Sequence, residues 1–127
     1  MSIETPHTDA HTALAALASR FVETDDLPWE TTPFPGVEVK ILMRNSETGA
    51  HTSLTRMAPG ARLPMHEHVG LEQSFVLEGS LVDEAGTVTA GNYVWRPAGS
   101  IHEAHAPDGC LVLGIFEQPN RFLDSQT

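Results

Sequence analysis

The stretch that decides the fold is residues 60–72, which read Gly60-Ala61-Arg62-Leu63-Pro64-Met65-His66-Glu67-His68-Val69-Gly70-Leu71-Glu72. His66 and His68 are two residues apart, and an extended backbone places side chains two apart on the same face. Glu72 has the same parity, and Gly70 gives the backbone room to bend before it. We therefore expect two imidazoles and one carboxylate to point to one side of a β structure.

A third imidazole comes from a separate segment, where residues 96–101 lead into His102. Three imidazoles and one carboxylate that converge predict a site for one divalent transition metal ion per chain, held by His66, His68, Glu72 and His102. The mixed nitrogen and oxygen donors suit Fe(II), Mn(II), Ni(II) or Zn(II). The absence of thiolate ligands argues against a closed structural zinc site.

Outward from these segments the chain shows the pattern of short β-strands. Residues 37–44 alternate between apolar and polar side chains, which predicts a half-buried strand, and a second strand is expected from about His51 to Met57. Six further short runs follow, separated by glycine or proline, at residues 71–78, 80–84, 87–90, 93–96, 102–106 and 110–117. This spacing predicts an all-β sandwich or barrel.

The N-terminal part has a different character. Apolar residues recur at helical spacing between Thr8 and Phe21, with Asp9 as a plausible N-cap, so we expect a short helical arm. Prolines in residues 25–36 predict an irregular connector. The expected division is an arm of residues 1–36 and a β-barrel domain of residues 37–127.

Other chemically active side chains have two interpretations each. His7 and His11 could share one helical face as a metal pair, or be solvated terminal residues, which we favour. His105 has the opposite parity to His102, so we expect it to face away, at the surface or behind the ligands. Cys110 lies in an apolar run and reads as a small core residue rather than a catalytic thiol.

Length and composition exclude several classes of protein. The chain has 127 residues, 40% of them hydrophobic and 19% charged, which favours one globular domain over disorder. A formal charge of −10 repels phosphate backbones and anionic lipids, so we expect no nucleic-acid and no membrane partner. The first residues contain neither a basic region nor an apolar stretch, which predicts a cytoplasmic protein.

The spacing of these residues resembles the two sequence motifs of the cupins. The first motif is met in full by Gly60, His66, His68, Glu72 and Gly79. The second is met by Gly91, Pro97, Gly99 and His102, with Ala106 at a final position where the family has asparagine. The resemblance implies a double-stranded β-helix, the jelly-roll barrel of cupins, around one metal.

A closer resemblance covers residues 38–110. The sequences of three segments, residues 54–60, 74–79 and 98–102, are similar to those of the subgroup that includes the cupin-like C-terminal domain of zinc-binding anti-sigma factors. In those proteins a separate domain binds zinc and the sigma factor through a His-x3-Cys-x2-Cys pattern. Cys110 is the one cysteine of this chain, so we do not expect sigma-factor sequestration.

The resemblance implies two classes of function. Many cupins with this ligand set are dioxygenases, so the leading hypothesis is a metal-dependent dioxygenase for a small oxygen-chelating metabolite, such as a diketone or a hydroxyaryl ketone. Glu72 would then be catalytic as well, by leaving the metal to accept a proton. The alternative is a non-enzymatic zinc- or ligand-binding sensor domain. An epimerase or isomerase typically lacks the full ligand set and is disfavoured.

Substrate contacts and assembly are also predicted. Ser74 and Val76 share the parity of Glu72 and should line the cavity. Arg56 either holds a substrate carboxylate or enolate, or is a surface or interface residue. We also predict a homodimer, because the barrel would have an exposed sheet edge and the arm with Trp29 and Phe34 offers apolar surface. The resemblance implies the same, since cupins of this size commonly form dimers.

Overall fold

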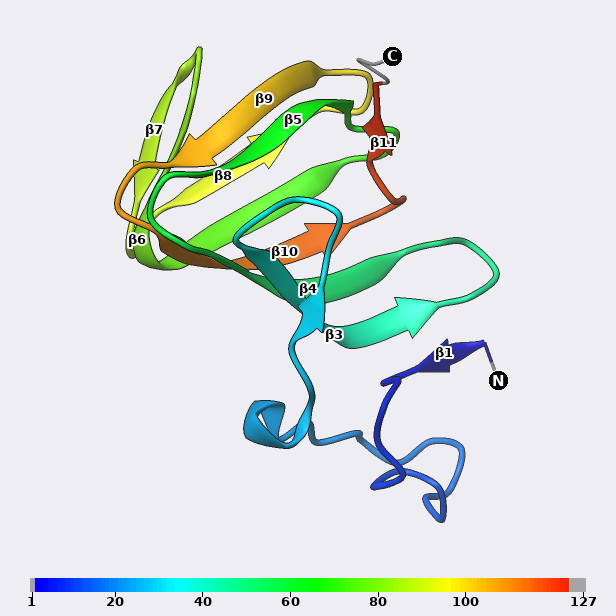
Figure 1. Ribbon diagram of the computed structural model, residues 1–127. Helices are drawn as coiled ribbons and strands as arrows, with labels where there is room; N and C mark the ends of the chain where they lie inside the picture. The colour runs from blue at the N-terminus through cyan, green and yellow to red at the C-terminus, as the bar shows by residue number, and fades with distance from the viewer. Residues whose placement is uncertain (1, 124–127) are drawn as a thin grey trace.

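The computed structural model describes residues 2–123, and in this range the chain folds into a curled β-structure (Figure 1). This confirms the predicted all-β class. The elements are β1 (Ile3–Glu4), the 3-10 turn η1 (Thr24–Asp26), β2 (Glu30–Thr31), β3 (Val37–Asn45), β4 (His51–Met57), β5 (Ala61–Glu67), β6 (Glu72–Asp83), β7 (Gly86–Thr89), β8 (Tyr93–Arg96), β9 (Ile101–Ala106), β10 (Cys110–Phe116) and β11 (Arg121–Phe122).

The long strand β6 joins two layers. The strands follow the order β1-β3-β4-β10-β6-β9-β5-β11, with β2 on β3 and both β7 and β8 on β6. Residues 72–75 of β6 pair with β8, whereas residues 80–83 pair with β7. The sheet therefore curls around one interior, with β5 and β9 above β10 and β4 in Figure 1.

Gly79 lets β6 run through the position where two separate strands were predicted. It has a φ of +75°, and a Cβ there would lie 2.0 Å from the carbonyl oxygen of Gly109. Any other residue would clash with backbone at this point, so the glycine allows β6 to continue into the second layer.

The core lies between the two layers. It contains nine buried residues: Val37, Met57, Ala61, Val76, Leu81, Ala104, Ala106, Cys110 and Val112. Phe34 of the Pro-rich connector packs against this cluster. Its contact with the core ties the connector to the barrel.

The predicted N-terminal helix is wrong. Residues 8–21 form isolated turns, such as the hydrogen bond from the Thr12 amide to the Asp9 carbonyl at 3.1 Å, and no α-helix occurs within residues 2–123. Leu17 and Phe21 are 98% and 82% exposed. A short helix is marginal in water unless its apolar face packs against something, and this face has no such contact.

The alternation predicted for residues 37–44 holds only in part. The pairing of β3 with β4 shifts register between Ile41 and Met43, and Lys40 is buried. Its Nζ donates to the carbonyl of Thr24 at 2.7 Å and lies 4.9 Å from the centre of the Trp29 ring. The connector therefore covers part of the outer face of the sheet.

No helix among the described residues has the length and apolar character needed to cross a bilayer.

Candidate metal centre

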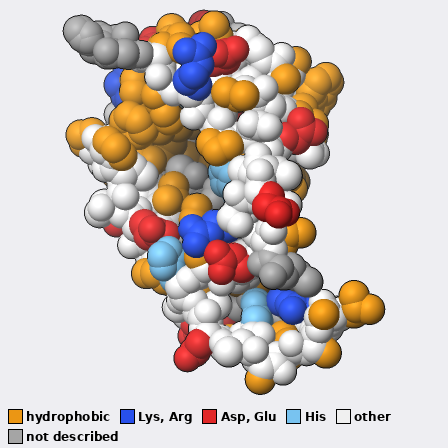
Figure 2. Space-filling view, turned by 90° about the vertical axis from the view of Figure 1, so that its right-hand side faces the viewer, with side chains coloured by type: hydrophobic (Ala, Val, Ile, Leu, Met, Phe, Trp, Pro, Cys, Tyr) orange, Lys and Arg blue, Asp and Glu red, His pale blue; other side chains and the backbone are white. Residues whose placement is uncertain are grey.

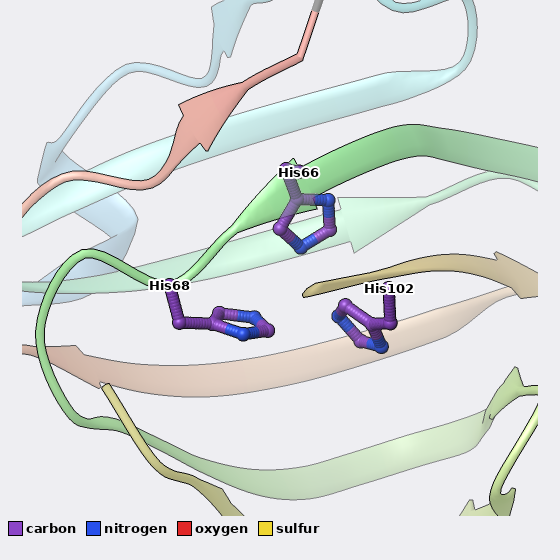
Figure 3. Close-up of side chains that lie close together, drawn as sticks. All are labelled: His66, His68 and His102. Atoms are coloured by element: carbon purple, nitrogen blue, oxygen red, sulfur yellow. The ribbon is translucent and has the colours of Figure 1, made fainter. Parts of the chain in front are cut away.

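Three buried histidines meet inside the curled sheet. His66 is near the end of β5, His68 follows that strand, and His102 is the second residue of β9. One ring nitrogen from each lies within 4.8 Å of the others, and the rings point toward one another (Figure 3). Their exposed fractions are 2%, 1% and 6%. The structure thus brings together three of the four predicted ligands.

Hydrogen bonds fix the orientation of the first two rings. His66 Nδ1 donates to the carbonyl of Pro64 at 2.8 Å. His68 Nδ1 lies 2.9 Å from Ser100 Oγ and 3.1 Å from the Ser100 carbonyl. Because carbonyl oxygens only accept, Nδ1 carries the proton in both rings, and Nε2 is the free nitrogen of the neutral imidazole.

The third ring is held by a carboxylate. His102 Nδ1 donates to Asp83 Oδ2 at 2.8 Å, and Arg96 Nη1 donates to the same oxygen at 2.8 Å. Burial alone would raise the pKa of Asp83, but the hydrogen bond from His102 and the charge of Arg96 lower it. Such outer hydrogen bonds orient metal-binding histidines in known sites.

Burial also favours the neutral form of two of the rings, those of His66 and His102. It is the largest cause that lowers the pKa of His66 and of His102, and for His102 the charge of Arg96 acts in the same direction. Neutral imidazole is the form that binds a metal ion.

Glu72 lies beside the histidine cluster. Its Oε1 is 3.2 Å from His68 Nε2, in ion-pair range but without hydrogen-bond geometry. Asn120 Nδ2 donates to Oε1 at 3.2 Å, and Ser74 Oγ donates to Oε2 at 3.0 Å. Burial alone would raise the pKa of Glu72, whereas the hydrogen bonds donated by Asn120 and Ser74 lower it. The side chain is therefore a carboxylate at neutral pH.

The residues present fit a metal ion. His68 Nε2 is buried and has no hydrogen-bond partner among the described residues. A buried, unpaired acceptor is costly, and a cation at the centre of the cluster would satisfy it. Three imidazole nitrogens with an adjacent carboxylate are typical donors for a first-row transition metal.

A small cavity adjoins the cluster. Its volume is about 60 Å³, and its apolar walls include Leu63, Leu81, Val112 and Phe116. Figure 2 shows a hollow among orange hydrophobic side chains, with a pale-blue histidine inside it. The cavity accommodates a few small groups next to the histidines, so a larger ligand would have to extend toward the opening.

Aromatic rings connect the cluster to the Pro-rich connector and to β11. The ring of Phe122 in β11 lies 5.0 Å from that of His66 and 4.5 Å from that of Phe34. The connector and the C-terminal strand thus pack together on the flank of the site.

The residues predicted to contact substrate have three different locations. Ser74 lines the histidine cavity, whereas Val76 is fully buried in the core and does not. Arg56 faces the outside of β4, where Nη2 donates to Glu38 at 2.7 Å and the guanidinium lies 4.1 Å from the Trp29 ring centre. It lines a separate groove of about 860 Å³. Arg56 therefore lies on the outer face of the sheet and not beside the histidine cluster.

Sequence reasoning missed four residues that complete the site: Asp83, Arg96, Ser100 and Asn120. Arg96 and Ser100 stand next to residues of the second motif, and this proximity could have drawn attention to them. Asp83 and Asn120 have no signal in sequence spacing, since they reach the site through strand pairing and a loop.

A comparison with models of protein families shows to which family the chain belongs. Residues 17–119 match the model of the ChrR cupin-like domain. The chain belongs to this cupin family. The cluster of three histidines and the curled sheet of this cupin agree with the resemblance seen in the sequence motifs.

Solved structures share the fold. An acetylacetone dioxygenase from Acinetobacter johnsonii is 23% identical, with a TM-score of 0.77, over 85% of this chain and 80% of that one. An RmlC-like cupin from Ralstonia eutropha JMP134 is 20% identical, with a TM-score of 0.77, over 85% and 74%. One chain in the structure of Rhodobacter sphaeroides SigE in complex with the anti-sigma ChrR is 29% identical, with a TM-score of 0.63. The match covers 72% of this chain and 50% of that one. No curated protein matches this cupin in sequence.

Proposed function

We propose that this cupin holds one divalent transition metal ion at His66, His68 and His102, with Glu72 as fourth ligand, and acts as a metal-dependent dioxygenase. Its substrate would be a small metabolite that chelates through two oxygens, such as a diketone or a hydroxyaryl ketone. The observation that most supports the metal site is the fixed orientation of the three rings, which leaves the Nε2 of His68 buried without a partner among the described residues.

The residues around the cluster have distinct roles in this proposal. A divalent iron, when bound, would supply Lewis acidity and one-electron redox chemistry. Glu72 is ionised and can accept a proton from a ligand in the cavity, while Ser74 holds one of its oxygens in place. Apolar walls such as Leu63 and Val112 keep bulk water away from the reacting groups.

A second candidate function is a non-enzymatic sensor that binds zinc or a small ligand through the same residues. The family match supports it, because the model is that of the ChrR cupin-like domain, and a structure with ChrR is 29% identical to this chain. Since both functions use the same histidines, the metal and the presence of turnover distinguish them.

Elemental analysis of protein purified without a metal-chelating tag tests the proposal first. Iron or manganese supports the dioxygenase, whereas zinc supports the sensor. The second arm is an oxygen electrode with Fe(II)-loaded protein and a panel of β-diketones, flavonols and hydroxyaryl ketones, with the double variant His66→Ala/His102→Ala as control. Oxygen uptake that exceeds the control supports the dioxygenase. Zinc in the native protein together with no uptake would overturn it.

A further inference from the structure

Arg96 is a partly exposed cation on the wall of the histidine cavity, and its buried Nε has no hydrogen-bond partner among the described residues. It is the last residue of β8 and pairs directly with Glu72 across the ladder between β8 and β6. Its side chain is 14% exposed, and its Nη1 donates to Asp83. Its Nε is buried and has no hydrogen-bond partner among the described residues, with Glu72 Oε2 at 4.0 Å.

An unpaired guanidinium N–H in such a place is unusual. Arginine stays protonated in proteins, and a buried donor without an acceptor is unfavourable. The donors of a guanidinium form a fork that matches the oxygens of an anion. The Asp83 carboxylate uses one branch of this fork, and the Nε branch remains available to a ligand in the cavity.

The charges around the cavity favour a ligand with one negative charge. Asp83 and Glu72 bring two carboxylates to the cavity, and Arg96 is the one guanidinium near both among residues 2–123, so these side chains together carry one excess negative charge. A divalent metal held by neutral imidazoles reverses this to one excess positive charge. Because an uncompensated charge is costly inside a protein, a monoanion is the ligand that balances the site.

We propose that Arg96 Nε binds one oxygen of a monoanionic chelating ligand and thereby makes the cavity selective for singly charged oxygen chelates over neutral ones. This rests on the proposed metal site and narrows its substrate class to enolates, carboxylates and similar monoanions. Asn120 Oδ1, which is buried without a partner among the described residues, offers an acceptor at the same cavity for a hydroxyl of the same ligand. The 60 Å³ cavity takes the charged end, and the remainder of the ligand extends toward the opening.

A purely structural role for Arg96 makes different predictions. In that case Arg96 would act only by holding Asp83 behind His102 and would not respond to a ligand. Replacing Asp83 would then reproduce the effect of replacing Arg96. The test therefore compares Arg96→Gln with Asp83→Asn, and uses Arg62→Gln, an exposed arginine on β5, as a neutral control.

The experiment uses the Zn(II)-loaded protein, in which no turnover competes with binding. Zinc affinity of each variant is measured first by calorimetry. Glycolate, a chelating monoanion, and glycolamide, its neutral isostere, are then titrated, and the Nε–H resonance of Arg96 is followed by ¹⁵N NMR. The resonance is assigned by its loss in Arg96→Lys.

We expect glycolate to shift the Arg96 Nε–H resonance and glycolamide to leave it in place. The preference for glycolate over glycolamide should fall tenfold or more in Arg96→Gln and less than threefold in Asp83→Asn and Arg62→Gln. An unmoved resonance in the wild-type protein, or an unchanged preference in Arg96→Gln, would overturn this inference while the metal site stands. Absence of zinc binding by the wild-type protein would overturn the metal site and this inference together. The wild-type NMR titration decides the question even if Arg96→Gln does not fold.

Discussion

His66 and His102 are direct partners in the antiparallel ladder between β5 and β9, and their ring centres lie 4.6 Å apart at an angle of 71°. The same ladder has an irregularity between Leu63 and His66. Side chains alternate along a strand, so a slip of one residue would turn His102 away from His66. The geometry of the metal site is therefore set by strand register as much as by the choice of histidine.

Removal of both members of this pair should abolish metal binding. The double variant His66→Ala/His102→Ala loses two of three imidazoles, and we expect its metal content to fall below about a tenth of the wild-type value, since each ligand contributes a strong bond. Inductively coupled plasma mass spectrometry of purified protein provides the measurement. The variant His105→Ala serves as control and should retain metal. Stoichiometric metal in the double variant would contradict the ligand assignment.

Asp83→Asn should weaken metal binding without abolishing it. The carboxylate orients His102 through its Nδ1, and loss of such a partner typically costs about 10- to 100-fold in metal affinity. Competition with a chromophoric chelator measures the affinity. Asp108→Asn, at an exposed position that does not line the histidine cavity, is the matched control. Equal affinities for Asp83→Asn and the wild-type protein would show that the hydrogen bond has no influence on the metal.

Glu72→Gln should lower turnover more than metal occupancy. The amide keeps the shape of the side chain but cannot accept a proton as the carboxylate does. If the protein is a dioxygenase, we expect oxygen uptake per bound metal to fall at least tenfold, while metal content falls less than threefold. Glu78→Gln, an exposed change on the same strand, should alter neither. Equal losses of uptake and metal would instead make Glu72 a ligand without a role in proton transfer.

Cys110 should be unreactive in the folded protein. Burial raises the pKa of its thiol to about 11, although a hydrogen bond involving the Met57 backbone acts against this. At pH 8 the native protein should react with a thiol reagent far more slowly than the chain in urea. Between pH 9 and 11 the unfolded thiol loses its proton first, so the free energy of unfolding should fall across that window. A flatter profile is expected for Cys110→Ala, and identical profiles would contradict the assignment.

The predicted homodimer has a candidate surface on the outside of β8 and β6. Phe75 and Tyr93 are direct partners there, and Trp95 on the same face is 59% exposed. We expect a second copy of the chain to cover this face, because exposed aromatic clusters of this kind usually mark an interface. Sedimentation should give a particle of twice 13.8 kDa, and Trp95→Lys should give a monomer. A wild-type monomer at micromolar concentration would refute the dimer.

Much of the architecture could be predicted from local pattern. Alternating side chains and glycine punctuation indicate short strands, and the spacing of His66, His68 and His102 indicates convergence, because parity in a strand decides which face a side chain takes. Parity also placed Ser74 correctly in the cavity. It could not place Val76, since one face of a strand serves both the cavity and the core.

The sequence-based predictions that failed, and the site residues that were missed, depend on contacts between distant parts of the chain. The helical spacing of residues 14–21 has no surface to pack against, so the pattern alone does not make a helix. Asp83 and Arg96 reach His102 and Glu72 through pairing across β6, β8 and β9, which sequence spacing does not reveal. These long-range partners are the residues on which the substrate class depends.

The three histidine rings differ in whether a main-chain or a side-chain group holds them in place. His66 is anchored to the main-chain carbonyl of Pro64, and replacing a side chain leaves that oxygen in place. His102 depends on the carboxylate of Asp83, and His68 in part on the hydroxyl of Ser100, both of which a single codon change can remove. A substitution at Asp83 or Ser100 would therefore alter how His102 or His68 is held, whereas no single side-chain replacement removes the oxygen that holds His66.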